Sequence, residues 1–465
     1  MGMAPSVSMT VTMLFLALSP ALGFNPAGLA PRLAVKDPRL TTSNHALLGL
    51  RSTVGPCIPV VSMSAQKSST SDLGSYAENL DKVVSLLGKA QTVMVLSGAG
   101  MSTAAGIPDF RSAGGLYDSS SSMLDKFTYL PDSPEVKDAL ERDVKMALTM
   151  SVLARNPLPY HEMRRGLILG VAANQWKATI GHLFPEILNQ NGKLRMLASQ
   201  NVDGIDHKVV SDKSKLFNPH GLIPTLVTEL TKEPLCREPS DPLYEKYVEL
   251  VKGNIKDIYA DRPPRRGKSS HLWPGPQNST PITLEMFGDL LPSEFGAAVE
   301  YEKANKVYSV KPGTVLFDRQ LWTETAAGES YNAFDDVRSS DLLLIMGTSL
   351  SGLTIDMLAH IAGDQEIPRV VFDMTTAPVE AMEWTEEDAF LQQPIDASIL
   401  DILQKMGWLE QLFDYLPQLC LGSLKSFRKY ILDHSQSTDM EEQIGKIDAA
   451  IEVEVDREKY FYGDD

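Results

Sequence analysis

Five short apolar runs, each ended by polar or glycine residues, constrain the fold of this chain more than any other feature. They cover residues 92–96, 194–198, 314–317, 341–346 and 369–372. Runs of this length and composition are typical of strands that are buried on both faces of a parallel sheet. Helical periodicity fills stretches before and between them, at 76–90, 180–191 and 353–362. The pattern predicts an open α/β sheet, which binds its ligands beyond the carboxyl ends of the strands.

The first run ends in a glycine loop, residues 97–102, before a predicted helix. The dinucleotide signature G-x-G-x-x-G would require glycine where Thr103 stands, so the ordinary dehydrogenase motif is broken. What remains is a loop whose bare backbone N–H groups could hold a diphosphate at the start of a helix.

Charge and cysteine content exclude two classes of function. The 465 residues include 43 Lys and Arg against 60 Asp and Glu, a formal net charge of −17. This balance disfavours binding to nucleic acid, which depends on neutralising phosphates. The three cysteines, Cys57, Cys236 and Cys420, form no CxxC pair, so a four-thiolate zinc site within the chain is excluded.

The first 63 residues resemble a targeting leader. Residues 11–22 are apolar but shorter than the roughly 20 residues that span a bilayer, and Ala21 and Gly23 supply a small-residue cleavage site. Residues 24–63 are rich in Ser, Thr, Pro and Arg and poor in acids. We expect a signal peptide at 1–23 and a transit peptide at 24–63, as in the bipartite presequences of algae with complex plastids, and no membrane attachment after processing. A mitochondrial leader and the secretory pathway are the alternatives.

Four motifs occur in a fixed order along the body of the chain. They are Gly98 to Arg111 (GAGMSTAAGIPDFR, followed by Gly115-Leu116-Tyr117), Ser199 to Gly204 (SQNVDG), His220-Gly221, and Gly347 to Leu350 (GTSL). In this order they resemble the sirtuin family of NAD-dependent protein deacylases, over about residues 76–412. The resemblance implies a Rossmann-like parallel sheet with helices on both faces, plus a smaller inserted domain.

The resemblance also implies the reaction and the residues that carry it. A sirtuin cleaves NAD at the nicotinamide–ribose bond and transfers the acyl group of an acylated lysine to ADP-ribose. His220 stands at the position of the family's base, and a neutral imidazole suits that role near pH 7. Asn201 and Asp203 complete the implied catalytic set. The implied cofactor-binding residues are Gly98, Ala99, Gly100, Ser102, Asp109, Phe110, Arg111, Gln200, Asn201, Asp203, Gly347, Thr348, Ser349, Asp373 and Ile395.

Individual roles follow from the same comparison. Gln200 and Asn201 would bond the ribose hydroxyls, Asp203 would accept from the nicotinamide carboxamide, and Ser102 and Ser349 would donate to phosphate. Phe110 would cover the reacting ribose carbon. Ile395 stands where the family meets the adenine with a Cys-Asp pair.

The chain departs from the family in three places. Most sirtuins carry two Cys pairs after His-Gly, whereas this chain has Cys236 alone, so we expect no zinc and a divergent small domain over residues 225–310. The family's Phe-Gly-Glu, which clamps the substrate peptide, is Phe317-Asp318-Arg319 here, with Val315 and Phe317 as the expected substrate contacts. Asp373 replaces the family's Asn beside the adenine ribose.

Residues 413–438 are expected to form a helical extension, and residues 439–465 a solvated acidic tail or an interaction tail. The sequence therefore predicts an NAD-dependent deacylase of acyl-lysine proteins, with no prediction of its oligomeric state. The alternatives are a mono-ADP-ribosyltransferase of the same fold, which the altered clamp favours, and an NAD-binding regulatory protein without turnover.

Overall fold

A computed structural model describes residues 73–107, 134–231, 233–252, 281–351, 354–434 and 439–462. The chain divides into two units, Met1–Met63 and Ser64–Asp465, and every described residue belongs to the second. The expected leader, 1–23 and 24–63, lies outside the described residues, as do Asp109, Phe110 and Arg111. None of the helices in the described ranges combines the length and the apolar character that a membrane crossing needs.

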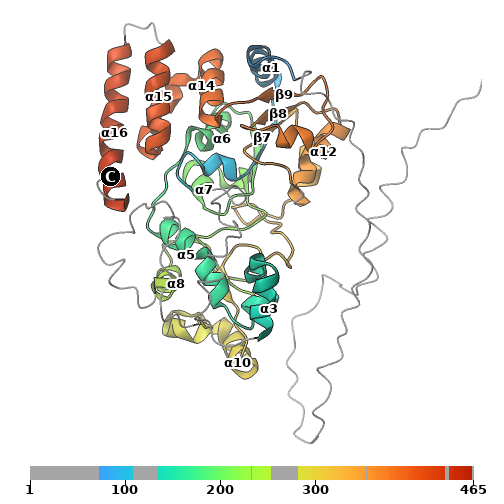
Figure 1. The fold of residues 1–465 in the computed structure, drawn as a ribbon, viewed down its shortest axis with the longest axis vertical. Coiled ribbons are helices and arrows are strands. Elements are labelled where there is room, and N and C mark those ends of the chain that lie inside the picture. The colour runs from blue at the N-terminus through green and yellow to red at the C-terminus, as the bar shows by residue number, and fades with distance from the viewer. Residues whose placement is uncertain are drawn as a thin grey trace, which may run out of the picture. The chain divides into compact units, whose positions relative to one another are not determined.

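A six-stranded parallel sheet forms the larger part of this unit (Figure 1). In sheet order its strands are β3 (Leu216–Phe217), β2 (Leu194–Ser199), β1 (Val93–Ser97), β7 (Leu342–Met346), β8 (Arg369–Phe372) and β9 (Ala389–Leu391). The chain runs outward from β1 to β3 on one side and from β7 to β9 on the other. The order therefore reverses between β1 and β7, which is the switch point of a doubly wound sheet.

Helices cover both faces of the sheet because successive strand residues point to opposite faces. Val93 and Val95 of β1 belong to the core under α1 (Tyr76–Lys89), α6 (Ile180–Gln190) and α14 (Ile395–Met406). Met94 and Leu96 belong to the opposite core, under α11 (Ala333–Val337), α12 (Met357–Asp364) and α13 (Ala377–Glu380). The Rossmann-like sheet with helices on both faces is confirmed.

In helix α1 the local sequence determines both where the helix begins and which face is buried. Ser75 and Glu78 form a capping box, in which the Ser75 Oγ accepts from the Glu78 N–H at 3.3 Å and the Glu78 carboxylate accepts from the Ser75 N–H at 2.9 Å. The helix then buries Leu80, Val83 and Leu87 against the sheet.

A smaller region lies beside the sheet, and it combines helices from residues 134–172 with the described parts of the segment 225–310. An antiparallel sheet joins β5 (Pro234–Cys236), β4 (Leu226–Thr228) and β6 (Val310–Pro312). The helices of this region are α3 (Pro134–Arg142), α4 (Met150–Leu153), α5 (Leu158–Ala172), α8 (Pro242–Lys252) and α10 (Gly296–Asn305), with short 3₁₀ turns at Val144–Leu148, Leu284–Leu290 and Ser293–Phe295.

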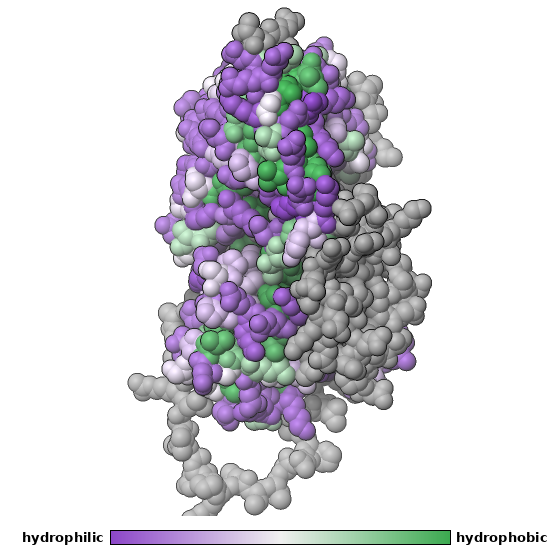
Figure 2. All heavy atoms as spheres, turned by 90° about the vertical axis from the view of Figure 1, so that its left-hand side faces the viewer, coloured by the Kyte–Doolittle hydropathy of each residue, from purple (hydrophilic) through white to green (hydrophobic). Residues whose placement is uncertain are grey.

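The C-terminal helices form a hairpin beside α14, which itself covers one face of the larger sheet. A 3₁₀ segment at Leu409–Gln418 leads into α15 (Leu421–His434), and α16 (Met440–Tyr462) packs along α15 (Figure 1). The expectation of a solvated tail from residue 439 is therefore corrected, since residues 440–462 are helical and packed. In Figure 2, which looks onto this side, the outer surface is mainly hydrophilic, with apolar side chains in narrow strips.

One predicted strand is absent. Residues 314–317 are buried in part but form no strand, because their backbone bonds go to two separate segments. The Val315 N–H donates to the His220 carbonyl at 2.8 Å and the Phe317 N–H to the Leu148 carbonyl at 3.0 Å. The remaining short elements are α7 (Ile205–Val209) and 3₁₀ turns at Ala99–Ser102, Lys213–Lys215 and Thr354–Asp356.

Candidate active site

The loops that follow β1, β2 and β7 meet at the carboxyl edge of the sheet. The Gly98 N–H donates to the Met346 carbonyl at 2.9 Å, and the Gln200 N–H donates to the Ser97 carbonyl at 2.9 Å. Three of the four sequence motifs thus lie together at the switch point, where an open α/β sheet binds its ligands.

The glycines of these loops are needed for close packing between the loops. A Cβ on Gly98 would lie 2.7 Å from the Thr348 Cβ, and one on Gly100 would lie 2.7 Å from the Gly347 Cα. Gly347 also has a φ of +60°, which favours glycine. The Gly98 and Gly100 N–H groups donate to backbone carbonyls of Met346 and Gly347, so these two N–H groups of the loop are already bonded within the protein.

A pocket opens beside this junction, and the expected carboxamide acceptor Asp203 lines it. The other lining residues are Ala99, Ser102, Ile107, Leu167, Asn201 and Val202. Asp203 is nine-tenths or more buried, and its Oδ1 accepts from the Ile205 N–H at 2.9 Å. Its Oδ2 accepts from the Ser102 hydroxyl at 2.7 Å. Two donors on a buried carboxylate fix its orientation beside the other pocket residues.

Ser102 is itself held by a histidine that the sequence did not single out. The Thr179 N–H donates to His182 Nδ1 at 3.2 Å, so Nδ1 is an acceptor and the ring proton lies on Nε2. That Nε2 lies 3.3 Å from the Ser102 Oγ and can donate to it, while Ser102 donates to Asp203. The expected role of Ser102 as a phosphate donor is replaced by this one, since its hydroxyl is buried and bonded to Asp203.

The two amides of the second motif are also anchored. The Asn201 Nδ2 donates to the Gly98 carbonyl at 3.0 Å and approaches the Ser102 Oγ at 3.3 Å. The Gln200 Nε2 donates to the Thr348 Oγ1 at 3.2 Å and to the Asp356 Oδ1 at 3.0 Å. Both side chains are therefore oriented before any ligand binds, which lowers the entropic cost of binding.

His220 follows the edge strand β3 and is held over the same loops. Its Nδ1 lies 3.0 Å from the Gln200 carbonyl, and because a carbonyl only accepts, Nδ1 carries the proton and Nε2 is left as the basic nitrogen. Burial lowers the pKa of His220 below its usual value. The Gln200 carbonyl and the Asp356 carboxylate raise the pKa, and the charge of Arg164 lowers it, but burial is the largest effect. The imidazole is therefore neutral at pH 7 and able to accept a proton.

The glycine after His220 explains why this loop has one conformation. Gly221 has a φ of +71°, and a Cβ there would lie 1.9 Å from the Gly313 carbonyl oxygen. In the His220-Gly221 pair, the histidine supplies the imidazole and the glycine permits the close backbone contact with the loop after β6.

Three further expected cofactor residues are Ser349, Asp373 and Ile395, and the first two make local contacts. Ser349 is exposed and its hydroxyl contacts Ser351 at 2.8 Å. Asp373 accepts from the Thr375 N–H and hydroxyl, each at 2.8 Å. Ile395 begins α14 and packs toward Gly181, beside the buried Asp396, whose Oδ1 accepts from the Gly181 N–H at 3.0 Å.

Several residues of the site carried no signal in the sequence. His182 lies in the helix predicted at 180–191 and Thr179 is its N-cap, but neither belongs to a recognised motif. Leu167 and Arg164 belong to α5, for which no helix was predicted. Only the tertiary structure brings Leu167 to the pocket, His182 to Ser102 and Arg164 close to His220, so no local pattern could have identified them.

No group of three or more His, Cys, Asp or Glu side chains in the described ranges is arranged to hold a metal ion. Cys236 lies in β5, and burial raises the pKa of its thiol to about 12, which opposes a metal-binding thiolate.

The fold and this site define a doubly wound α/β protein with a neutral histidine and an anchored Gln-Asn-x-Asp segment at its switch point. The chain belongs to the Sir2 family, since the model of that family matches residues 98–353.

The chain is similar to several named proteins. The chain is 24% identical over 361 residues to the NAD-dependent deacetylase sir2D of Dictyostelium discoideum, a match covering 74% of this chain and 48% of that protein. It is 25% identical over 327 residues to the NAD-dependent protein deacetylase sirtuin-3 of Mus musculus, covering 70% of this chain and 74% of that protein. A solved structure described as "Structural Basis for the Mechanism and Regulation of Sir2 Enzymes" has 17% identity and a TM-score of 0.45, covering 71% of this chain and 99% of the other. The chain spans about half of the sir2D protein and about a third of sirtuin-1 of Rattus norvegicus, at 48% and 34%.

Proposed function

We propose that this protein is an NAD-dependent protein-lysine deacylase, which releases nicotinamide and forms O-acyl-ADP-ribose. The observation that carries the proposal is the fixed tautomer of His220, with a basic Nε2 beside the Gln200-Asn201-x-Asp203 segment. A protein that only binds NAD has no need of a positioned base. The names of the relatives, which are NAD-dependent deacetylases, support the same activity.

The residues at the pocket fit NAD by their chemistry. Asp203 has lone pairs beyond those that Ser102 and Ile205 use, so it can accept from the carboxamide N–H of nicotinamide. The side-chain oxygens of Gln200 and Asn201 can accept from ribose hydroxyls, because their Nδ2 and Nε2 groups already bond the protein. When bound, NAD supplies the electrophilic ribose carbon and the nicotinamide leaving group.

His220 has two tasks in this scheme. Its Nδ1–H bond to Gln200 holds the ring in place, and its neutral Nε2 removes a proton from a ribose hydroxyl. Because burial lowers the pKa of His220, this base form persists when the pH falls below the usual histidine range. The proposed second substrate is a protein bearing an acylated lysine.

The test incubates the full chain with NAD and a panel of acyl-lysine peptides, and follows nicotinamide and O-acyl-ADP-ribose by mass spectrometry. We expect product from the wild type and a loss of about 10²- to 10⁴-fold in His220→Ala, the range for removing a general base. His434→Ala is the control, because His434 stacks on Tyr430 in α15, away from the pocket, and should keep full activity.

Other products would contradict the proposal in distinct ways. ADP-ribosylated protein, or free ADP-ribose without acyl transfer, would indicate an ADP-ribosyltransferase. Binding of NAD without nicotinamide release would indicate a regulatory protein.

A further inference from the structure

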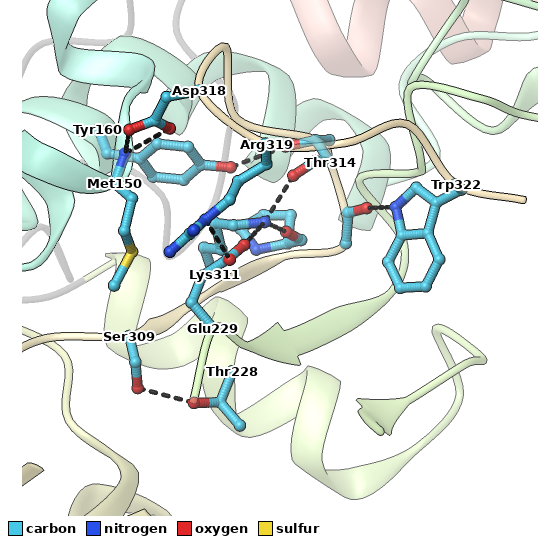
Figure 3. Close-up of polar contacts among 12 residues, drawn as sticks. Met150, Tyr160, Thr228, Glu229, Ser309, Lys311, Thr314, Asp318, Arg319 and Trp322 are labelled. Carbon is cyan, nitrogen blue, oxygen red and sulfur yellow. Dashed lines mark hydrogen bonds and ion pairs between the residues drawn. The ribbon is translucent and has the colours of Figure 1, made fainter. Parts of the chain in front are cut away.

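A cluster of three charged side chains lies in the smaller region, on β6, on the loop that follows it and on the residue after β4. The carboxylate of Glu229 contacts two cations, the Lys311 Nζ at 3.0 Å and the Arg319 Nε at 3.3 Å (Figure 3). One negative charge thus faces two positive charges.

Lys311 depends on that carboxylate more than Arg319 does. The Lys311 side chain is only 1% exposed, and this burial lowers the pKa of its ammonium group. The charges of Arg164 and Arg319 lower the pKa further, whereas the Glu229 carboxylate raises it. The Lys311 Nζ also donates to the Thr314 carbonyl at 2.5 Å and to the Pro312 carbonyl at 3.2 Å. A buried ammonium without its carboxylate would be strongly destabilising, so Glu229 stays with Lys311.

Arg319 therefore carries a charge that Glu229 compensates only in part. Its side chain is 46% exposed. The carboxylate of the neighbouring Asp318 is bonded elsewhere, since both of its oxygens accept from the Met150 N–H, at 2.9 and 3.1 Å, at the start of α4. Figure 3 shows Asp318 on the α4 side and Arg319 on the Glu229 side of the loop.

The same loop is tied to the proposed base. The Val315 N–H donates to the His220 carbonyl at 2.8 Å, four residues before Arg319. Between them Phe317 is 55% exposed, although most large apolar side chains of the described structure are buried. An exposed aromatic ring and an exposed guanidinium thus belong to a loop whose backbone is hydrogen-bonded to His220.

We infer that Phe317 and Arg319 form a recognition surface for protein substrates whose acyl-lysine is flanked by acidic side chains. The inference rests on the proposed deacylase function and specifies its substrate class. Phe317 supplies apolar contact and Arg319 supplies a hydrogen-bonding fork for a carboxylate. Where the family has the Glu of Phe-Gly-Glu, this chain has the guanidinium of Arg319, and this change favours acidic over basic side chains of a substrate at that position.

The experiment uses the full chain, NAD and three acetyl-lysine peptides that differ only in the residues flanking the acetyl-lysine, which are Glu, Gln or Lys. We expect kcat/KM for the Glu peptide to exceed that for the Gln peptide by about fivefold, the size expected of one partly exposed ion pair, and the Lys peptide to be the poorest. The preference should shrink as salt is raised, because salt screens exposed charges.

Variants of Arg319 show whether the peptide preference comes from this surface or from the net negative charge of the whole protein. In Arg319→Gln the ratio of Glu to Gln peptide should fall to about one, and in Arg319→Glu it should invert. Arg338→Gln is the matched control. Arg338 is 47% exposed and pairs with Asp335 on α11, so this variant should keep the wild-type ratio.

Each outcome bears on one proposal. Deacetylation of all three peptides at equal rates, or a Glu preference that survives in Arg319→Glu, would overturn this inference and leave the deacylase function intact. Failure of every peptide to release nicotinamide would overturn the deacylase function itself.

Discussion

At the scale of single residues, the site depends on a few positions where backbone and side chains meet at short range. Gly98, Gly100 and Gly347 allow two loops to touch, and Gly221 allows the His220 loop to touch the loop after β6. Polar side chains then fix one another, as Thr179, His182 and Ser102 do for Asp203. The orientation of Asp203 is thus fixed by side chains that have no proposed role in the reaction.

Gly221→Ala tests this role, with Gly407→Ala as its matched control. Both glycines have a φ of +71°, but a Cβ on Gly407 would meet nothing within 4 Å, whereas one on Gly221 would lie 1.9 Å from the Gly313 oxygen. Gly407→Ala should cost about 1 kcal/mol of unfolding free energy, the cost of a left-handed alanine. Gly221→Ala should cost several times more and reduce deacylase activity, because the His220 loop must move. Urea unfolding and kcat/KM measure the two effects. Equal unfolding midpoints for the two variants would refute the role of the contact.

At the scale of elements, the C-terminal helix α16 is attached to the segment that joins α5 to α6. Glu454 is fully buried and pairs with Lys177 at 2.5 Å and with Arg457. Arg457 also donates to the carbonyls of Asn174 and Gln175, at 3.1 and 3.0 Å. Since α5 carries Leu167 and α6 carries His182, α16 holds together two helices that line or support the pocket.

Removing that carboxylate should be costly. We expect Glu454→Ala to lower the unfolding free energy by about 3 kcal/mol, because two cations lose their buried partner. The exposed Glu442 of the same helix, which pairs with Lys446, provides the control, and Glu442→Ala should cost less than about 1 kcal/mol. Chemical denaturation of the two variants makes the comparison. A loss in Glu454→Ala no larger than in Glu442→Ala would show that α16 does not anchor the connection.

At the scale of the whole molecule, the smaller region holds its fold through an apolar core. Helix α8 buries Leu243, Tyr244, Tyr247, Val248 and Val251, and these side chains share one core with Leu226, Leu235 and Val310 of the antiparallel strands. Burial of this extent can stabilise a small sheet by the hydrophobic effect, which is the contribution that a structural zinc would otherwise make.

We therefore expect the protein to fold and act without zinc. Purified full-length chain should contain far less than one zinc per molecule by elemental analysis, and a strong chelator should leave both its melting temperature and its activity unchanged. A stoichiometric zinc whose removal lowers the melting temperature would contradict this expectation and would point to ligands outside the described residues.

Much of the larger sheet could be predicted from sequence. Runs at 92–96, 194–198, 341–346 and 369–372 correspond to β1, β2, β7 and β8, because strands buried on both faces are continuous apolar runs. The similar run at 314–317 is not a strand, and the two- and three-residue strands β3 and β9 carried no signal. Apolar composition shows that a segment is buried, but not which backbone groups it bonds.

The candidate site divides in the same way. Sequence alone identified His220, Asn201 and Asp203 as the proposed reactive groups and placed Asn201 and Asp203 after a strand, because motif and strand end are both local patterns. Tertiary structure decided the tautomers of His220 and His182, the use of the Gly98 and Gly100 N–H groups, and the sharing of Glu229 between Lys311 and Arg319. Each of these features depends on a bonding partner that is not a neighbour in the sequence. A hydrogen bond or an ion pair forms only when two groups are close in space, and the order of residues alone does not give that distance.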